Sequence, residues 1–298
     1  MFKKIVSLLG FFLLTNPLYL PRALAGVVSA RIDGENPSAT VSKNNIKVDL
    51  YAQKRKGKEG EFVVSKVSVF ERENKVLELE GAESFFPMAQ VQIAEMDKSN
   101  TTPEIIFESY TGGAHCCAEL FILTKQNGKW KVIEGGVFDG GPRGVSDVDK
   151  NGIYEYVTID NSFLYTFASY AESVAPPQIW SIQSGKLINA TKQPQYGPWL
   201  KNELNKLWQQ RGRDSKNNNA FWAAYVAWKA LLGEEVAAWQ LMLKNYNKNE
   251  NYCLDKGEGY WIYDRCKNKV KFPQALLVFL RENGYLNNES VRRISTIK

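Results

Sequence analysis

The sequence contains 298 residues, 44% of them hydrophobic, and carries a formal net charge of +6. A chain of this length suits one large or two small domains with real hydrophobic cores. Three positive charges, Lys3, Lys4 and Arg22, lie in an N-terminal segment that we expect to be removed, which leaves a net charge of about +3. A charge this small argues against a nucleic-acid partner.

The first 25 residues predict an export signal. Lys3 and Lys4 form a positive start, an apolar run follows at 5–14, and Ala23-Leu24-Ala25 is a small-x-small site that predicts cleavage after Ala25. The run is shorter than the ~20 residues of a spanning helix, so an uncut membrane anchor is the weaker alternative. No later stretch of the sequence is long and apolar enough to span a bilayer. We therefore expect a periplasmic or secreted protein with no membrane span after signal cleavage.

Residues 26–195 have the pattern of strands separated by turns. Short segments rich in β-branched and aromatic residues are bounded by turn residues. Asn127-Gly128, between two such segments, predicts a two-residue hairpin. The predicted strands are 26–32, 46–52, 61–70, 75–79, 90–94, 104–110, 117–124, 130–134, 154–159 and 179–182.

From Pro198 onward the composition favours helices. Apolar residues recur at helical spacing in 199–210, 221–232 and 236–246, and a last helix is predicted at 273–283. Gly233, followed by two glutamates, predicts a helix stop and a new acidic first turn, which makes a helical hairpin. We expect an α+β protein with a signal peptide at 1–25. A β-rich domain at 26–195, built as a sandwich or as partial blade-like sheets, precedes a small helical domain at 196–298.

Residues 147–155 place oxygen donors at positions 1, 3, 5 and 9 of a nine-residue loop, with Gly152 at position 6. A hard dication such as calcium takes several oxygens at about 2.3–2.6 Å, and glycine permits the sharp turn that brings them together. The alternative is an Asp/Asn/Gly turn that holds no metal. We predict a calcium site that stiffens the loop. Its candidate ligands are Asp147, Asp149, Asn151, Ile153 through its backbone carbonyl, and Glu155.

The loop is not of the helix–loop–helix type, because position 12, where such sites place a bidentate glutamate, is Thr158. Glu155 instead begins a predicted strand. This layout resembles the calcium-binding loops of FG-GAP and VCBS-type repeats, in which an acidic loop leads directly into a β-strand. The sequence departs from that pattern at Asn151, where an aspartate is usual. The lower ligand charge implies a modest affinity.

A weaker copy of this loop lies about 50 residues earlier. Residues 95–98, followed by 103–107, resemble residues 147–150 followed by 154–157. A period of this length suits a blade or sandwich repeat, although two copies cannot close a propeller. The first copy lacks the turn glycine, so any ion site there would be degenerate.

The only histidine of the chain, His115, stands beside Cys116 and Cys117, and three interpretations remain open. A soft-metal site would need further ligands that the spacing does not supply. A Cys–His nucleophile pair would need side chains that face each other, whereas neighbours on a strand point to opposite faces. The favoured interpretation is structural: a vicinal disulfide or buried thiols after a Gly112-Gly113 turn.

The other two cysteines, Cys253 and Cys266, bracket a short loop in the helical region. An exported protein can oxidise its cysteines, and four cysteines allow three pairings that the sequence does not separate. We favour Cys253–Cys266.

Residues 109–117, the acidic loop about thirty residues later, and then 160–165 and 175–177 together resemble a group of exported bacterial proteins of unknown function. The alanine- and tryptophan-rich helices at 221–242 are similar to the C-terminal part of that group. The resemblance implies a shared fold and compartment, and no particular activity.

The sequence lacks a nucleophile elbow, a phosphate loop, a zinc-protease motif and a dinucleotide fingerprint. We therefore expect a non-enzymatic, calcium-binding envelope protein with a binding or scaffolding role and no catalytic residue. Its partner would be an envelope component or protein that the sequence does not identify. The alternative is a secreted hydrolase that acts on cell-wall glycan or peptide through carboxylates such as Asp139, Asp160 and Glu172.

Overall fold

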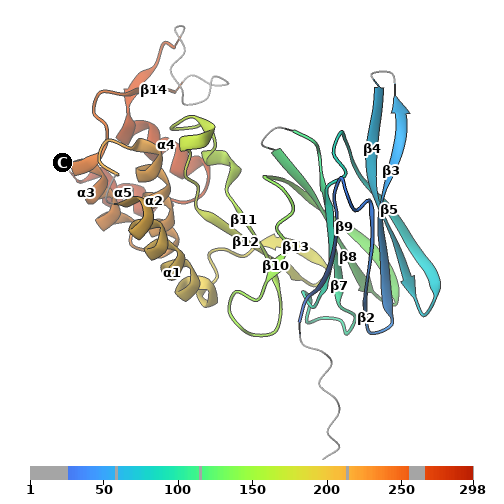
Figure 1. Cartoon of the computed structure of the whole chain (residues 1–298). Helices are drawn as coiled ribbons and strands as arrows, with labels where there is room; N and C mark the ends of the chain where they lie inside the picture. The colour runs from blue at the N-terminus through green and yellow to red at the C-terminus, as the bar shows by residue number, and fades with distance from the viewer. Residues whose placement is uncertain (1–25, 58–59, 114–115, 213–214, 255–265, 298) are drawn as a thin grey trace, which may run out of the picture.

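The computed structural model describes residues 26–57, 60–113, 116–212, 215–254 and 266–297, so the predicted signal peptide lies outside the described residues. Three sheets stand side by side, and a group of helices packs at the far end of the molecule (Figure 1). This arrangement confirms the predicted α+β class.

The sheet farthest from the helices is an antiparallel meander of four strands (Figure 1). Its neighbour is a five-stranded antiparallel sheet in the order β1-β6-β7-β8-β9. Buried aliphatic and aromatic side chains from both sheets form one core between them, so the pair is a β-sandwich. The strands of the meander are β2 (Ser38–Lys43), β3 (Ile46–Gly57), β4 (Gly60–Glu71) and β5 (Asn74–Ser84). Those of the second sheet are β1 (Val28–Ile32), β6 (Ala89–Ala94), β7 (Glu104–Tyr110), β8 (Cys116–Gln126) and β9 (Lys129–Asp139).

The five-stranded sheet is buried on both faces along its central strands. In β7, Ile105 and Phe107 pack into the sandwich core, whereas Ile106 packs into a second core on the opposite face. Successive strand residues point to opposite faces, so a strand covered on both sides shows an unbroken apolar run instead of alternation.

A third, four-stranded sheet covers that opposite face. It contains β10 (Val145–Ser146), β11 (Glu155–Ile159), β12 (Pro177–Gln183) and β13 (Lys186–Asn189). Its inner face contributes Tyr156 and Ile182 to the second core. Its outer face contributes Ile179 to a third core, shared with the helices. The sheet therefore joins the sandwich to the helical region.

The helical region is held together by buried aromatic side chains. Trp222 and Trp228 are buried, and their indole N–H groups donate to the carbonyls of Ser215 and Leu200 at 2.9 and 3.1 Å. The helices are α1 (Gly197–Leu207), continued by a π-helical turn at Trp208–Gly212, α2 (Asn219–Leu231), α3 (Glu235–Asn245), α4 (Phe272–Glu282) and α5 (Asn288–Ser295). A two-stranded sheet, β14 (Asn251–Cys253) with β15 (Lys269–Lys271), lies among them.

Two predicted turns are confirmed. Asn127 and Gly128 both have positive φ, 50° and 75°, and connect β8 to β9 in a tight hairpin. Gly233, with φ 72°, ends α2 before α3 begins. The strands and the α-helix absent from the prediction are polar or very short: β2, β10, β13, β14, β15 and α5.

Candidate metal centre

The acidic loop connects β10 to β11, and its three carboxylates converge. One oxygen from each of Asp147, Asp149 and Glu155 lies within 4.8 Å of the others. A cation at about 2.4 Å from each ligand would place opposite oxygens about 4.8 Å apart. The three carboxylates are therefore close enough to share one ion.

Backbone N–H groups of the loop hold these carboxylates in place. Asp147 accepts from the N–H of Asn151 at 2.9 Å and from that of Gly152 at 3.0 Å. Asn151 donates its side-chain amide to Asp149 at 2.8 Å and accepts from the N–H of Ile153 at 2.8 Å. Gly152 has φ 84°, the left-handed conformation that glycine adopts without strain. The loop is thus a set of interlocked turns around the acidic groups.

Glu155 is the first residue of β11 and is 99% buried. Its two oxygens accept from the N–H of Val148 at 2.9 Å and from the Tyr196 hydroxyl at 3.1 Å. Burial, helped by the charges of Asp149 and Asp147, raises the pKa of Glu155 from 4.5 to about 7. The hydroxyl pKa of Tyr196 is also raised, first by burial and then by the charge of Glu155. A dication in the loop would favour the charged form of this carboxyl group.

Of the five candidate ligands, the structure brings the three carboxylates together and ties Asn151 to Asp149. Ile153 and Glu155 also line a cleft beside the loop. Tyr196 is the partner that the sequence does not reveal, because it lies 41 residues beyond Glu155 and carries no local motif.

The weaker copy of the loop connects β6 to β7 and has the same layout. Glu104, the first residue of β7, accepts from the N–H groups of Met96 and Asp97 at 2.7 and 3.1 Å. Asn100 and Thr124 donate to its other oxygen at 3.0 and 2.8 Å. This carboxylate is therefore enclosed by protein donors.

Cys116 and Cys117 form a vicinal pair. The structure pairs these two cysteines with each other and pairs Cys253 with Cys266, so none of the four cysteines, all of which are described, is a free thiol. His115 lies outside the described residues. No described group therefore supports the soft-metal or thiol-nucleophile interpretation.

Two of the carboxylates named for a hydrolase, Asp139 and Asp160, accept hydrogen bonds from different tyrosines. Asp139 accepts from the Tyr170 hydroxyl at 2.8 Å, whereas Asp160 accepts from the Tyr285 hydroxyl at 2.7 Å. A cavity of about 290 Å³ at Asp160 has neither Asp139 nor Glu172 in its lining. Asp160 therefore does not share this cavity with the other two carboxylates.

Layered antiparallel sheets, an aromatic helical region and an acidic loop at the start of a strand define an α+β protein with one candidate cation loop. The chain belongs to the family of sll0997. It is 39% identical over 271 residues to the "Probable thylakoid lumen protein sll0997" of Synechocystis sp. (strain ATCC 27184 / PCC 6803 / Kazusa). The aligned region covers 87% of this chain and 76% of that protein. The family model for the sll0997 C-terminal domain matches residues 200–284.

Another relative is the "Uncharacterized protein y4bJ" of Sinorhizobium fredii (strain NBRC 101917 / NGR234). It is 35% identical over 229 residues, which are 74% of this chain but 36% of that protein. The chain thus spans about a third of that relative's length. No solved structure matches the chain. Within the described residues, no helix has the length and apolar character needed to cross a membrane.

Proposed function

We propose that this protein is an exported, non-enzymatic binding or scaffolding protein whose acidic loop at residues 147–155 holds one calcium ion. The convergence of Asp147, Asp149 and Glu155 within 4.8 Å is the observation that carries the calcium assignment. Oxygen-only donors on a turn-rich loop suit calcium, because this ion takes oxygen ligands in a flexible geometry. The resemblance to FG-GAP and VCBS-type loops fits the same assignment.

Export is supported by the N-terminal sequence and by the relative named for the thylakoid lumen. Extracellular calcium modules bind at about 10⁻⁴–10⁻³ M, so a site of modest affinity suits an exported protein. The ion would fix the loop between the sandwich and the helices and so stiffen the junction.

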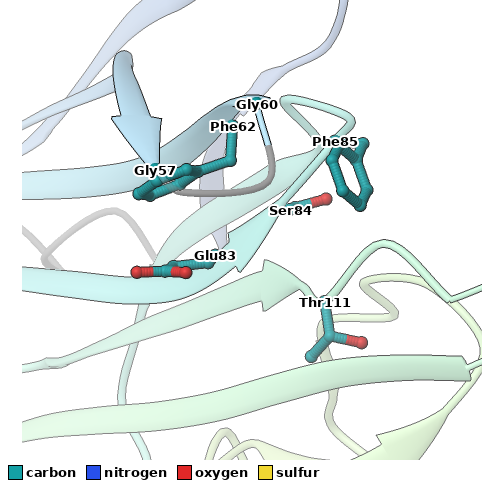
Figure 2. A pocket seen from close by; sticks show the side chains of 7 residues that line it. All are labelled: Gly57, Gly60, Phe62, Glu83, Ser84, Phe85 and Thr111. Atoms are coloured by element: carbon teal, nitrogen blue, oxygen red, sulfur yellow. The ribbon is translucent and has the colours of Figure 1, made fainter.

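An exposed apolar surface supports the binding role. Phe85 and Phe86, in the loop after β5, are 70% and 60% exposed. Beside them is a cavity of about 390 Å³, and Figure 2 shows Phe62 and Phe85 at separate positions around it, with Ser84 between them. Exposed aromatic side chains next to a cavity are a common feature of interaction sites. We assign this surface to the unidentified envelope partner.

A carboxylate hydrolase would need two acidic groups in one cleft, and the cleft beside the loop has Asp97 and Glu155 in its lining. Both are buried, and hydrogen bonds with the protein engage their oxygens. A general acid or base must reach the substrate proton directly or through one water. The geometry therefore favours ion binding over proton transfer.

Thermal unfolding of the chain without its predicted signal tests the calcium proposal. We expect calcium to raise the Tm relative to the same protein in chelator, because an ion that binds only the folded state stabilises it. Asp149→Asn should abolish the rise, and Glu61→Gln, at an exposed position on β4, is the matched control that should keep it. Superimposable curves for the wild type in calcium and in chelator would refute the proposal.

A pull-down of envelope components, with and without calcium, tests the binding role. A Phe85→Ser/Phe86→Ser variant should lose the captured partner while it unfolds at the wild-type temperature, because both side chains are exposed. Equal capture by the wild type and this variant would show that the partner does not bind at this surface.

A further inference from the structure

A cavity of about 290 Å³ lies where the third sheet meets the helices. The ends of four elements form its walls: Gln178 near the start of β12, Asn189 at the end of β13, Leu231 at the end of α2, and Asn283 directly after α4. The volume is close to the lower limit of ligand pockets, which span about 300–1,000 Å³. The cavity is therefore a candidate site for a small ligand.

Asp160 is a buried acidic residue at this cavity, and it forms no ion pair with a described lysine or arginine. Its donors are neutral: the N–H and hydroxyl of Ser162 bind one oxygen at 3.0 and 2.7 Å, and the Tyr285 hydroxyl binds the other at 2.7 Å. An ionised carboxylate accepts about four hydrogen bonds, so the second oxygen can take one more. Because Asp160 lines the cavity and remains 8% exposed, a ligand there has access to it. Buried charges are normally paired, which favours a cationic group as the donor.

The ends of two helices add to the preference for a cation on this side. Leu231 is the last residue of α2 and Asn283 is the C-cap of α4, and both line the cavity. The C-terminal end of a helix carries a partial negative charge and attracts cations. The Lys192 ammonium group shows this preference, because it donates to the carbonyl of Gly284, just after α4.

Lys192 also supplies a positive charge at the exposed side of the cavity. An ammonium group has three N–H donors, and the Gly284 carbonyl takes one of them. No hydrogen bond to the described chain uses the other two, so they can hold a carboxylate. Asp160 and Lys192 are the charged residues of the described lining, which therefore has no net charge.

The uncharged residues of the lining are mainly of two kinds. The side-chain amides of Gln178, Asn189 and Asn283 can both donate and accept hydrogen bonds. Pro177 and Leu231 add apolar surface. A complementary ligand therefore has one positive group, one negative group and a small apolar part.

We propose that this cavity binds a small zwitterion, an α-amino acid with a short side chain, whose ammonium group donates to Asp160 and whose carboxylate accepts from Lys192. The cavity shares no lining residue with the cleft beside the acidic loop. The inference therefore goes beyond the proposed function and does not depend on calcium.

Isothermal titration calorimetry in chelator tests the inference on the chain without its predicted signal, with glycine, L-alanine, L-serine and L-valine as probes. We expect at least one of them to bind. The amide of that amino acid lacks the carboxylate, and its N-acetyl derivative lacks the ammonium group. Each derivative should bind about 10-fold more weakly or worse, because each loses a charge-assisted hydrogen bond. If none of the four amino acids binds, or if either derivative binds as tightly as its amino acid, the inference is wrong.

Lys192→Met provides the residue-level test, because it removes the ammonium group and keeps an unbranched, exposed side chain. It should weaken binding of the amino acid about 10-fold and leave binding of the amide unchanged, since the amide has no carboxylate to pair with Lys192. Lys186→Met, at an exposed position on β13 outside the lining, is the matched control and should change neither affinity. Equal losses for the amino acid and its amide in Lys192→Met, or no loss for either, would overturn the assignment.

Discussion

Glu95 contributes to the pH dependence of the stability of this protein, and Glu95→Gln should remove that contribution. One of its carboxylate oxygens is buried without a hydrogen-bond partner in the described residues. Burial and the nearby charge of Glu104 raise its pKa from 4.5 to about 7, whereas Lys43 acts in the opposite direction. The folded state therefore keeps the proton to a higher pH than the unfolded state does. Stability contributed by this group is present below pH 4.5 and is lost as the pH rises toward 7.

The magnitude follows from the difference between about 7 and 4.5. At about 1.4 kcal/mol for each unit of pKa, the ionised group costs about 3 kcal/mol at pH 8. Water that reaches the partly exposed side chain reduces this figure to about 1–3 kcal/mol. On the same scale the cost at pH 5 is below about 1 kcal/mol.

Urea denaturation in chelator, at pH 5 and at pH 8, measures this effect. Glu95→Gln should raise the free energy of unfolding by about 1–3 kcal/mol at pH 8 and by much less at pH 5. Glu61→Gln, at an exposed position, should change it at neither pH. A variant that is less stable than the wild type at pH 8 would show that attraction to Lys43 outweighs burial, and the reasoning would be wrong.

Three further changes test the fold. Gly152→Ala should lower the free energy of unfolding by about 1–2 kcal/mol, because φ is 84° there while nothing lies within 4 Å of the added methyl group; a much larger loss in urea denaturation would indicate a clash. The double variant Cys253→Ser/Cys266→Ser should lose about 3 kcal/mol in the same assay, and equal stability would remove any role for this disulfide. Trp222→Phe, which loses a buried hydrogen bond, should cost about 2–4 kcal/mol, whereas Trp208→Phe, 39% exposed, should unfold within a few degrees of the wild-type Tm.

Strong local patterns allowed most of the fold to be predicted. The apolar run within 104–110 identifies β7, and the Asn127-Gly128 turn places the β8–β9 hairpin, although β9 runs to Asp139, five residues past its predicted end. β2 escaped prediction because it is a polar edge strand with an alternating, mostly exposed pattern. The last helix, α5, is short and polar, and its packing against α3 helps to hold it: the Ser290 hydroxyl donates to the buried Glu235 at 2.8 Å.

The candidate site also has a part that the sequence predicted and a part that it did not. The spacing of oxygen donors in 147–155 predicted the loop because all the donors are neighbours in the chain. Tyr196, Ser181 and Asp97 could not be predicted, since they come from a helical turn, from β12 and from the loop between β6 and β7, and lie near the acidic loop only in the folded protein. Local spacing predicts a loop, whereas the cleft beside it depends on the packing of the layers.

The two acidic loops differ in how many lone pairs their strand-initiating glutamates have left. An ionised carboxylate accepts about four hydrogen bonds. Glu104 receives four, two on each oxygen, from backbone and side-chain donors. Glu155 receives two, from Val148 and Tyr196, so each of its oxygens retains a free lone pair for a cation.

The weaker copy is therefore closed by the protein's own donors, and we expect one calcium ion per chain and not two. Calorimetric titration of calcium into the metal-free protein should give a stoichiometry of one. Glu155→Gln should abolish binding, because it removes a charge and an acceptor from the open site. The same change at Glu104 should lower stability without altering the stoichiometry, since it leaves buried N–H donors unpaired. Two equivalents of bound calcium, or a loss of binding in the Glu104 variant alone, would show that hydrogen-bond saturation does not distinguish the two loops.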